Sequence, residues 1–237
     1  MVIDIHNHIG RDRDGTTQTV EQLKESMKHN GITGSAVFPF DEETDLVEAS
    51  LGLLKHEGNG VYPFLRFDPK TVNAERVKEL LSNDKFYGVK LHPRSQDFDP
   101  LDPKYRSIYE AIAESGKPVL IHTRMEKLQN SDPERVVKLG EMHPKLNIII
   151  GHFAGAYGKA LDEIGKRKNL YVETSVMSSN VIIRMTAEKI GAEKILFGSD
   201  STYSDQEIEL MKVRKSGVGR NEMEMMMHGN AASLLNL

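Results

Sequence analysis

Residues 118–152 have the sequence PVLIHTRMEKLQNSDPERVVKLGEMHPKLNIIIGH and contain one complete strand, helix and strand. The runs 118–123 and 147–152 are short and apolar, as buried strands are. Between them, residues 134–142 have helical spacing after Asp132 and Pro133, a pair that favours a helix start. Two buried strands separated by an amphipathic helix form a parallel βαβ unit, so this stretch predicts a parallel sheet covered by helices.

The same alternation of short apolar runs and longer amphipathic stretches continues along the whole chain. The strand candidates are residues 2–8, 34–40, 61–67, 87–92, 118–123, 147–152, 170–175 and 195–200. Eight such units in 237 residues fit one eightfold β/α barrel, which typically has about 250 residues. We therefore expect an α/β fold, specifically a (β/α)8 TIM barrel, formed by a single domain over residues 1–237.

Composition excludes several classes of function. The formal net charge is −4 and the Lys and Arg residues are dispersed, so a nucleic-acid partner is not expected. The chain has no Cys, which leaves only nitrogen and oxygen ligands for a metal. No apolar run approaches the roughly 18 residues of a membrane span, and Met1 is followed by no basic and apolar leader. We expect a cytoplasmic protein without a membrane partner.

Histidines end several of the predicted strands. His6 and His8 end the first, and His92, His122 and His152 end the fourth, fifth and sixth at intervals of 30 residues, which is about the length of one βαβ unit. In a β/α barrel the carboxyl ends of all strands open onto one face, so these side chains are expected to meet there. An imidazole at that face is placed to bind a metal or to move a proton.

Alternation along a strand puts His6 and His8 on one face, where they can share a metal; otherwise they are polar residues at an exposed strand end. A single histidine in the position of His122 or His152 is more often a core or loop residue. Because histidines recur at the ends of successive strands, a common site is favoured. Asp200 ends the eighth run, where a carboxylate can complete a His/Asp site and accept a proton from water. Its alternative role is to cap the next helix.

Cationic residues near the strand ends are candidates for substrate binding. Lys90 lies two residues before His92 and so shares its face. It has three interpretations: an ion pair, a contact to an anionic substrate, or a carboxylated amine bridging two metals. Arg66, Arg94 and Arg124 lie at or just beyond strand ends, where a guanidinium can hold a carboxylate through two hydrogen bonds; otherwise they are surface residues. Arg124 is the favoured one.

Six segments carry a resemblance to a known family. They are Ile3-Asp4-Ile5-His6-Asn7-His8, Gly88-Val89-Lys90-Leu91-His92-Pro93, Pro118-Val119-Leu120-Ile121-His122-Thr123, Ile149-Ile150-Gly151-His152-Phe153-Ala154-Gly155, Leu196-Phe197-Gly198-Ser199-Asp200 and Gly229-Asn230-Ala231-Ala232-Ser233-Leu234-Leu235. With these segments in this order along the chain, the protein resembles the amidohydrolase superfamily. It resembles in particular the amidohydrolase-related (amidohydrolase 2) branch, which includes the aminocarboxymuconate-semialdehyde decarboxylase group.

The resemblance implies a barrel of the metal-dependent hydrolase type with a divalent metal, most often zinc, bound by His6, His8, His122 and Asp200. His152 is then the catalytic base, with Asp200 as the other proton acceptor, or a ligand if a second ion binds. The implied reaction is hydrolysis of a small carboxylic ester, lactone or amide through a metal-activated water. The alternative is non-oxidative decarboxylation of an unsaturated or aromatic acid. The expected partner is a small carboxylate-bearing substrate, and a homodimer is one expectation for assembly.

Two other classes compete with this interpretation. A non-catalytic barrel that binds a small acidic ligand has the same strand-end cations. A phosphoesterase of the histidinol-phosphatase type also begins with a His-x-His strand, but its three-metal cluster needs more histidine and carboxylate ligands than this sequence provides. A metal-dependent hydrolase is the prediction that uses all of the strand-end residues.

Overall fold

The structure is a computed structural model that describes residues 1–41, 45–124, 129–156 and 159–237. Its centre is one nine-stranded sheet in the order β2-β1-β3-β4-β5-β6-β7-β8-β9. The strands are β1 (Ile3–Arg11), β2 (Thr17–Gln18), β3 (Gly34–Pro39), β4 (Val61–Arg66), β5 (Gly88–Leu91), β6 (Val119–Ile121), β7 (Ile148–Ile150), β8 (Leu170–Glu173) and β9 (Ile195–Leu196). All neighbours pair in parallel except β2, which is antiparallel to β1.

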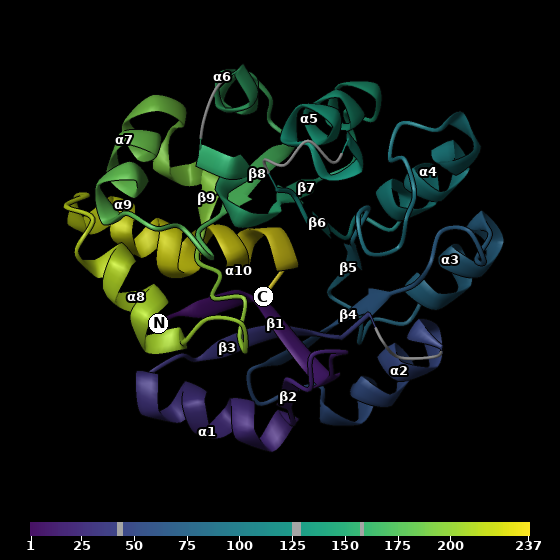
Figure 1. The fold of residues 1–237 in the computed structure, drawn as a ribbon, viewed down its shortest axis with the longest axis horizontal. Helices are drawn as coiled ribbons and strands as arrows, with labels where there is room; N and C mark the ends of the chain where they lie inside the picture. Colours follow the sequence, from purple (N-terminus) through teal and green to yellow (C-terminus); the bar gives the residue numbers. More distant parts are fainter. Residues whose placement is uncertain (42–44, 125–128, 157–158) are drawn as a thin grey trace.

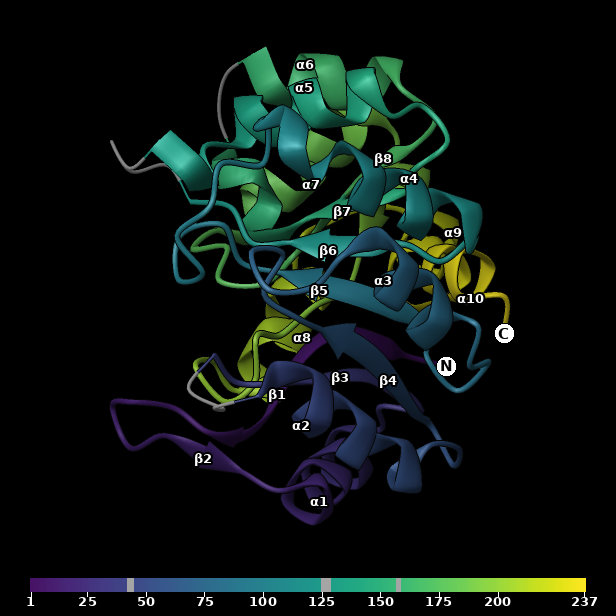
Figure 2. The ribbon, with the colours of Figure 1, turned by 90° about the vertical axis from the view of Figure 1, so that its right-hand side faces the viewer.

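Helices follow the strands and surround the sheet, as Figures 1 and 2 show. The α-helices are α1 (Val20–Asn30), α2 (Leu46–Leu53), α3 (Ala74–Leu81), α4 (Arg106–Glu114), α5 (Pro133–Met142), α6 (Lys159–Lys166), α7 (Asn180–Ile190), α8 (Gln206–Arg214), α9 (Arg220–Glu224) and α10 (Asn230–Leu235). Short helical turns are η1 (Leu54–His56), η2 (Pro103–Tyr105), η3 (Gln129–Ser131), η4 (Gly151–Ala156), η5 (Ala192–Lys194) and η6 (Met225–Gly229).

The sheet curls until its two ends meet. The backbone N–H of Ile5 donates to Phe197 O at 3.0 Å, and that of His8 donates to Ser201 O at 2.8 Å. Asn7 and Ser201 form a parallel bridge. Hydrogen bonds therefore join β1 to the segment after β9, and the predicted α/β fold with a barrel-like parallel sheet is confirmed.

All eight predicted strands are present, and β2 is the addition. This two-residue strand pairs with the end of β1, which extends to Arg11. Two residues are too short for a pattern, so β2 could not be predicted.

Helix boundaries also follow the local sequence: Thr19 and Gln22 form a capping box at the start of α1, and Gly31 ends that helix at φ 69°.

Two apolar layers hold the barrel together. The larger one lies between the sheet and the surrounding helices. The smaller one joins side chains from inside the sheet to α10: Ile3, Ile5, Ala36, Phe38, Phe64, Leu120, Ile149, Leu196, Ala231, Leu234 and Leu235. Burying this layer away from water is the main stabilising contribution at the amino ends of the strands, and it leaves the carboxyl ends for polar groups.

Strand alternation then places the functional residues. Arg66 lies two residues beyond Phe64 of the inner layer, and His122 lies two residues beyond Leu120. Since successive side chains alternate between the two faces of a strand, each polar residue lies on the same side as the apolar residue before it, one layer higher. The inner face of the barrel therefore changes from apolar to polar toward the carboxyl ends.

Among the described residues, no helix combines the length and apolarity that crossing a bilayer requires.

Candidate active site

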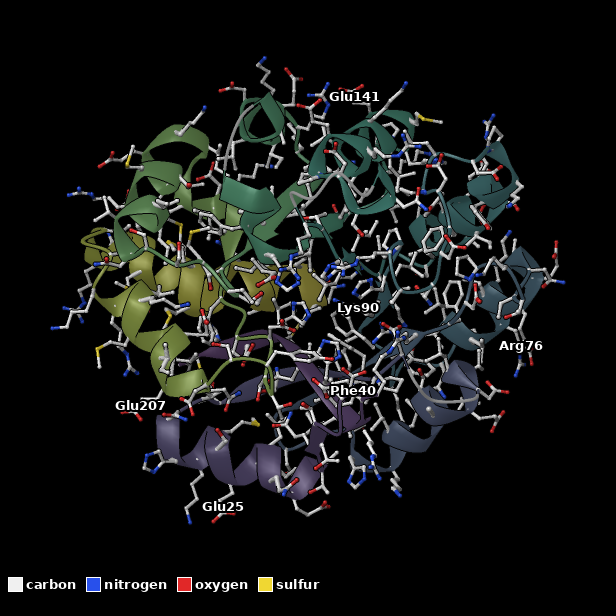
Figure 3. The ribbon with its side chains drawn as sticks, in the orientation of Figure 1. Glu25, Phe40, Arg76, Lys90, Glu141 and Glu207 are labelled. Carbon is white, nitrogen blue, oxygen red and sulfur yellow. The ribbon has the colours of Figure 1, made fainter. Side chains whose placement is uncertain are left out.

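A cavity of about 760 Å³ lies at the carboxyl ends of the strands. Its lining residues include His8, His92, His122, His152 and Asp200, so the described structure brings the predicted strand-end residues together. In Figure 3, labelled Lys90 and Phe40 lie near the centre of the barrel, whereas Glu25, Arg76, Glu141 and Glu207 lie at the periphery.

His6, His8 and Asp200 form the most compact group of this site. Asp200 Oδ1 lies 3.1 Å from His6 Nε2 and 3.2 Å from His8 Nε2. All three residues are buried, and their ligand atoms lie within 4.8 Å of one another. Ligand atoms about 2.0–2.2 Å from a zinc ion are separated by roughly 3.3–3.6 Å in a tetrahedron. The two separations from Asp200 Oδ1 are within about 0.2 Å of that range, so this donor set fits a small divalent ion.

The backbone around Asp200 holds its carboxylate toward the histidines. Asp200 has a left-handed φ of 60°, which is uncommon outside glycine, and its N–H donates to His6 O at 2.9 Å. The preceding Ser199 donates to the buried carboxylate of Asp4 from its N–H at 2.9 Å and from its Oγ at 2.6 Å. A fully buried carboxylate on β1 thus fixes the loop that carries Asp200.

Glu173, at the end of β8, orients this group and was missed by the sequence analysis. Its Oε1 accepts from His6 Nδ1 at 3.0 Å, from the backbone N–H of His152 at 2.6 Å and from Ser175 Oγ at 2.8 Å. Glu173 is fully buried. Because Nδ1 of His6 donates its proton to Glu173, the lone pair of that ring is on Nε2, where it can bind a metal or, as here, accept from Lys90 Nζ at 3.0 Å. The available signal was an acid inside the predicted strand 170–175.

Gly198 makes room for Glu173. A Cβ at Gly198 would overlap Glu173 Oε2, whereas a Cβ at Gly151 would be only in ordinary contact with Glu173 Oε1, at 3.5 Å. Gly198 lies in an apolar run that the sequence analysis identified as a strand. The small residue at this position is therefore part of how the sheet accommodates a buried carboxylate.

A hydrogen-bond chain from Glu173 assigns the tautomers of two further histidines. Since Ser175 Oγ donates to Glu173, it accepts from His152 Nδ1 at 2.9 Å. His152 Nε2 then accepts from His122 Nδ1 at 2.9 Å. The Nε2 of His122 is buried with no hydrogen-bond partner among the described residues, so its lone pair faces no competing donor there. His92 stacks on His122 with ring centroids 3.7 Å apart.

His122 belongs to neither of the three-residue groups of closely spaced ligand atoms found in the described part of the chain. One group is His6, His8 and Asp200, and the other is His6, His152 and Glu173. The second group is a hydrogen-bonded network, as the contacts of Glu173 above show. The role of His122 as a ligand therefore stays a prediction that rests on its free, buried nitrogen.

Burial keeps the imidazoles of His6 and His8 neutral. It lowers the pKa of His6 and of His8 well below the usual 6.5, and the nearby Lys90 ammonium lowers both further. Burial also raises the pKa of Asp200 from 3.8 to about 6. Metals bind the neutral imidazole and the ionised carboxylate, so protonation of Asp200 would weaken any metal binding at this site as the pH falls.

Lys90 and Arg66 are both fully buried, so neither side chain is exposed for direct contact with a substrate. Lys90 Nζ lies 3.0 Å from His6 Nε2 and 4.8 Å from the centre of the Phe38 ring, and burial lowers its pKa to about 7. Arg66 is fully buried; it donates to Pro39 O at 2.7 Å and forms an ion pair with Asp41. Both cations therefore face protein groups, and their predicted contact with substrate remains a prediction.

Arg94 and Arg124 line the cavity, as the sequence predicted for substrate-binding cations. Lys212, on α8, also lines it and was not predicted. Phe40 and Tyr203 form an aromatic wall beside His8, because the Phe40 ring stacks on His8 at 4.9 Å and meets the Tyr203 ring edge-on at 5.8 Å. The cavity thus combines cations, the carboxylates of Asp12, Asp41, Asp200 and Glu209, and two aromatic rings.

Comparison with known families agrees with the fold. The model of the family described as amidohydrolase matches residues 3–237. The chain belongs to the amidohydrolase family. Comparison of the sequence with curated proteins found no match.

Solved structures with a similar fold include members with different reactions. This amidohydrolase matches 5-carboxyvanillate decarboxylase from Sphingomonas paucimobilis with a TM-score of 0.79 and 15% identity, covering 100% of this chain and 99% of that one. A dihydroxybenzoic acid decarboxylase from a Polaromonas species, with bound manganese and 2-nitroresorcinol, has a TM-score of 0.83 and 15% identity, covering 100% and 97%. A probable 2-pyrone-4,6-dicarboxylic acid hydrolase from Acinetobacter baumannii, with bound citric acid, has a TM-score of 0.77 and 14% identity, covering 100% and 99%.

Proposed function

We propose that this amidohydrolase is a metal-dependent hydrolase of a small carboxylic ester, lactone or amide that also carries a carboxylate. The observation that carries the proposal is the position of Asp200 Oδ1, 3.1 and 3.2 Å from the Nε2 atoms of His6 and His8. A carboxylate and two neutral imidazoles at metal-ligand spacing, buried at the bottom of a cavity, are suited to a catalytic metal.

His6, His8 and Asp200 would hold the ion, with His122 as the fourth ligand and zinc as the proposed metal. A divalent ion bound there polarises a carbonyl and makes hydroxide available near neutral pH. Glu173 fixes the orientation of His6, and neutral rings at both histidines supply the lone pairs. The proposed site thus needs no protonation change in its histidines between pH 7 and pH 8.

His152 is the proposed proton carrier. Its Nδ1 is held by Ser175 Oγ, and its backbone N–H is held by Glu173, so the ring position is fixed. Its ring lines the cavity, and its Nε2 accepts from His122 Nδ1. In the proposed reaction Nε2 exchanges this hydrogen bond for one to water, takes a proton and returns it to a leaving group. Asp200 is the second proton acceptor, and Arg94 and Arg124 bind the substrate carboxylate.

Decarboxylation of an unsaturated or aromatic acid is the second candidate. The aromatic wall of Phe40 and Tyr203 favours it, because a flat ring packs against such a surface. Two of the solved structures with this fold are decarboxylases by name. In this reaction the cations would hold the carboxylate and His152 would deliver the proton that replaces it.

A cytoplasmic location and a homodimer stay predictions.

The two reactions are separated by a substrate panel. The zinc-loaded protein is mixed with lactones and with unsaturated carboxylic acids, and ring opening and carbon dioxide release are measured. We expect turnover that His122→Ala abolishes and that the control His56→Ala, remote from the cavity, leaves unchanged. No turnover of any panel member argues for a non-catalytic binding barrel. Turnover that His122→Ala does not alter argues that the activity arises outside the proposed site.

A further inference from the structure

His92 lies in the wall of the cavity and has no role so far. It follows β5 directly and lines the cavity together with His122 and His152. Its ring stacks on that of His122, with the centroids 3.7 Å apart and the two planes 14° apart. Neither the predicted ligand set nor the proposed mechanism includes this residue.

A backbone contact fixes where the proton of the His92 ring lies. The N–H of Ser95 donates to His92 Nδ1 at 3.2 Å. A peptide N–H can only donate, so Nδ1 must carry a lone pair and no proton. An imidazole with a lone pair on one nitrogen is neutral and has its proton on the other. His92 is therefore neutral, with an N–H at Nε2.

Nε2 is the polar atom of this ring that the cavity can reach. No described residue forms a hydrogen bond with Nε2, and His92 contributes none of the buried polar atoms that lack a partner. In a half-buried residue, a polar atom that has no partner and is not buried must be accessible. Since the residue lines the cavity, Nε2 presents its N–H to a ligand there.

The turn after β5 holds this donor in place. Gln96 Oε1 accepts from the backbone N–H of His92 at 2.7 Å, and the same side chain donates to Phe67 O at 2.6 Å. The N–H of Gln96 also donates to His92 O at 3.0 Å. With His122 against one face of the ring, the donor is in position before a ligand binds. A donor fixed in this way needs no reorganisation when charge develops on its partner.

The charge of the neighbours indicates which ligand atom the donor serves. Arg94 and Arg124 line the same cavity and are better partners for a carboxylate than a neutral imidazole is. Burial lowers the pKa of His92 well below 6.5, and the nearby Arg66 and Lys90 cations lower it further, which agrees with the neutral ring. A neutral donor stabilises most effectively an oxygen that becomes negative only during the reaction.

We infer that His92 is a catalytic residue whose neutral Nε2–H donates a hydrogen bond to the carbonyl oxygen of the bond that is hydrolysed. This role rests on the proposed function, because it requires an acyl substrate. The water oxygen bonds to the carbonyl carbon, one water proton goes to His152 Nε2, and the π electrons move to the carbonyl oxygen, which becomes an oxyanion. When these electrons return, the bond to the leaving group breaks and the leaving group takes the proton from His152. His92 keeps its own proton throughout.

The first measurement locates the proton and needs no substrate. Two-bond ¹H–¹⁵N correlation spectra of protein labelled with ¹⁵N-histidine distinguish protonated from unprotonated ring nitrogens, and the signals that disappear in His92→Phe belong to His92. At pH 7.5 we expect the proton of His92 on Nε2 and none on Nδ1. A proton on Nδ1, with or without one on Nε2, overturns the inference.

The second measurement compares two variants that differ in the donor. His92→Phe keeps a flat ring beside His122 and removes the N–H, whereas His92→Gln retains an amide N–H. With a lactone or ester that the wild type hydrolyses, we expect kcat of His92→Phe to fall about 100-fold, as for the loss of one oxyanion donor, with KM within about threefold. His92→Gln should recover about tenfold of this loss. The exposed His29 on α1 supplies the control, His29→Phe, which should keep the wild-type kcat.

Zinc content is measured in every variant, because His92 could instead act only by supporting His122. A fall in kcat that is matched by loss of zinc overturns the catalytic role. So does a kcat of His92→Phe within about threefold of the wild type, a loss confined to KM, or a loss that His92→Gln does not relieve.

The two proposals can fail separately. If no member of the substrate panel is turned over, the proposed function fails, whatever the position of the proton on His92. If substrates are hydrolysed and His92→Phe leaves kcat unchanged, only the role of His92 fails.

Discussion

Replacing Glu173 with Gln should weaken metal binding without removing any metal ligand. Oε1 of Glu173 accepts from His6 Nδ1, His152 N and Ser175 Oγ, and Oε2 accepts from Ser175 N at 2.7 Å. Every one of these partners is a donor. A glutamine has one acceptor oxygen and one amide NH₂, so in either orientation the NH₂ faces a donor.

The size of the effect follows from these contacts. Loss of a partner that orients a metal-binding histidine typically costs 10- to 100-fold in metal affinity. In free energy this is about 1.4–2.8 kcal/mol. We expect the upper part of the range, because the variant loses the charge that strengthens the bond to His6 and also gains an unfavourable donor–donor contact.

Zinc affinity is measured by competition with a chromophoric chelator at pH 7.5. Glu57→Gln is the control: Glu57 accepts from Tyr87 Oη at 2.9 Å near the amino ends of the strands, far from the cavity. The control should bind zinc as the wild type does. If Glu173→Gln also binds zinc with wild-type affinity and unfolds at the same temperature, Glu173 does not orient His6 and the reasoning is wrong.

Three further predictions follow from the same geometry. Gly198→Ala should reduce zinc affinity about tenfold, because the added Cβ would displace Glu173. The control Gly52→Ala should not, because its Cβ would meet open space. Equal zinc affinities in the two variants would refute this prediction. Asp41→Ala leaves the fully buried Arg66 without its carboxylate and should lower the free energy of unfolding by about 3 kcal/mol in urea titrations, and a loss under about 1 kcal/mol would show that Arg66 is satisfied elsewhere. Zinc affinity should fall about tenfold per pH unit below about pH 6, because the raised pKa of Asp200 means that its carboxyl group takes up a proton there. A decline in zinc affinity that starts only near pH 4 would contradict the raised pKa.

The sequence predicted the parts of the site that depend on strand ends. Eight apolar runs sufficed to predict the parallel sheet, and the convergence of His6, His8 and Asp200 follows from having all carboxyl ends at one face. The bulge in β1 between Asp4 and Asn7 does not change this outcome, since both histidines still contact Asp200.

Residues that act through other residues could not be predicted in this way. Glu173 lies within a buried strand, and its importance depends on which donors surround it in space. Arg66 has the strand-end position of a substrate contact, yet Asp41 and Pro39 occupy its guanidinium. Such assignments need the partner of each polar atom, which spacing along the chain does not give.

Elemental analysis of the purified protein, before and after addition of zinc, decides whether His6, His8 and Asp200 form a metal site. We expect one tightly bound divalent ion per chain in the wild type, its retention in the surface variant Asp162→Asn, and its loss in Asp200→Ala. A wild-type protein that contains no divalent ion and takes up none after zinc is added would contradict the proposed metal-dependent activity.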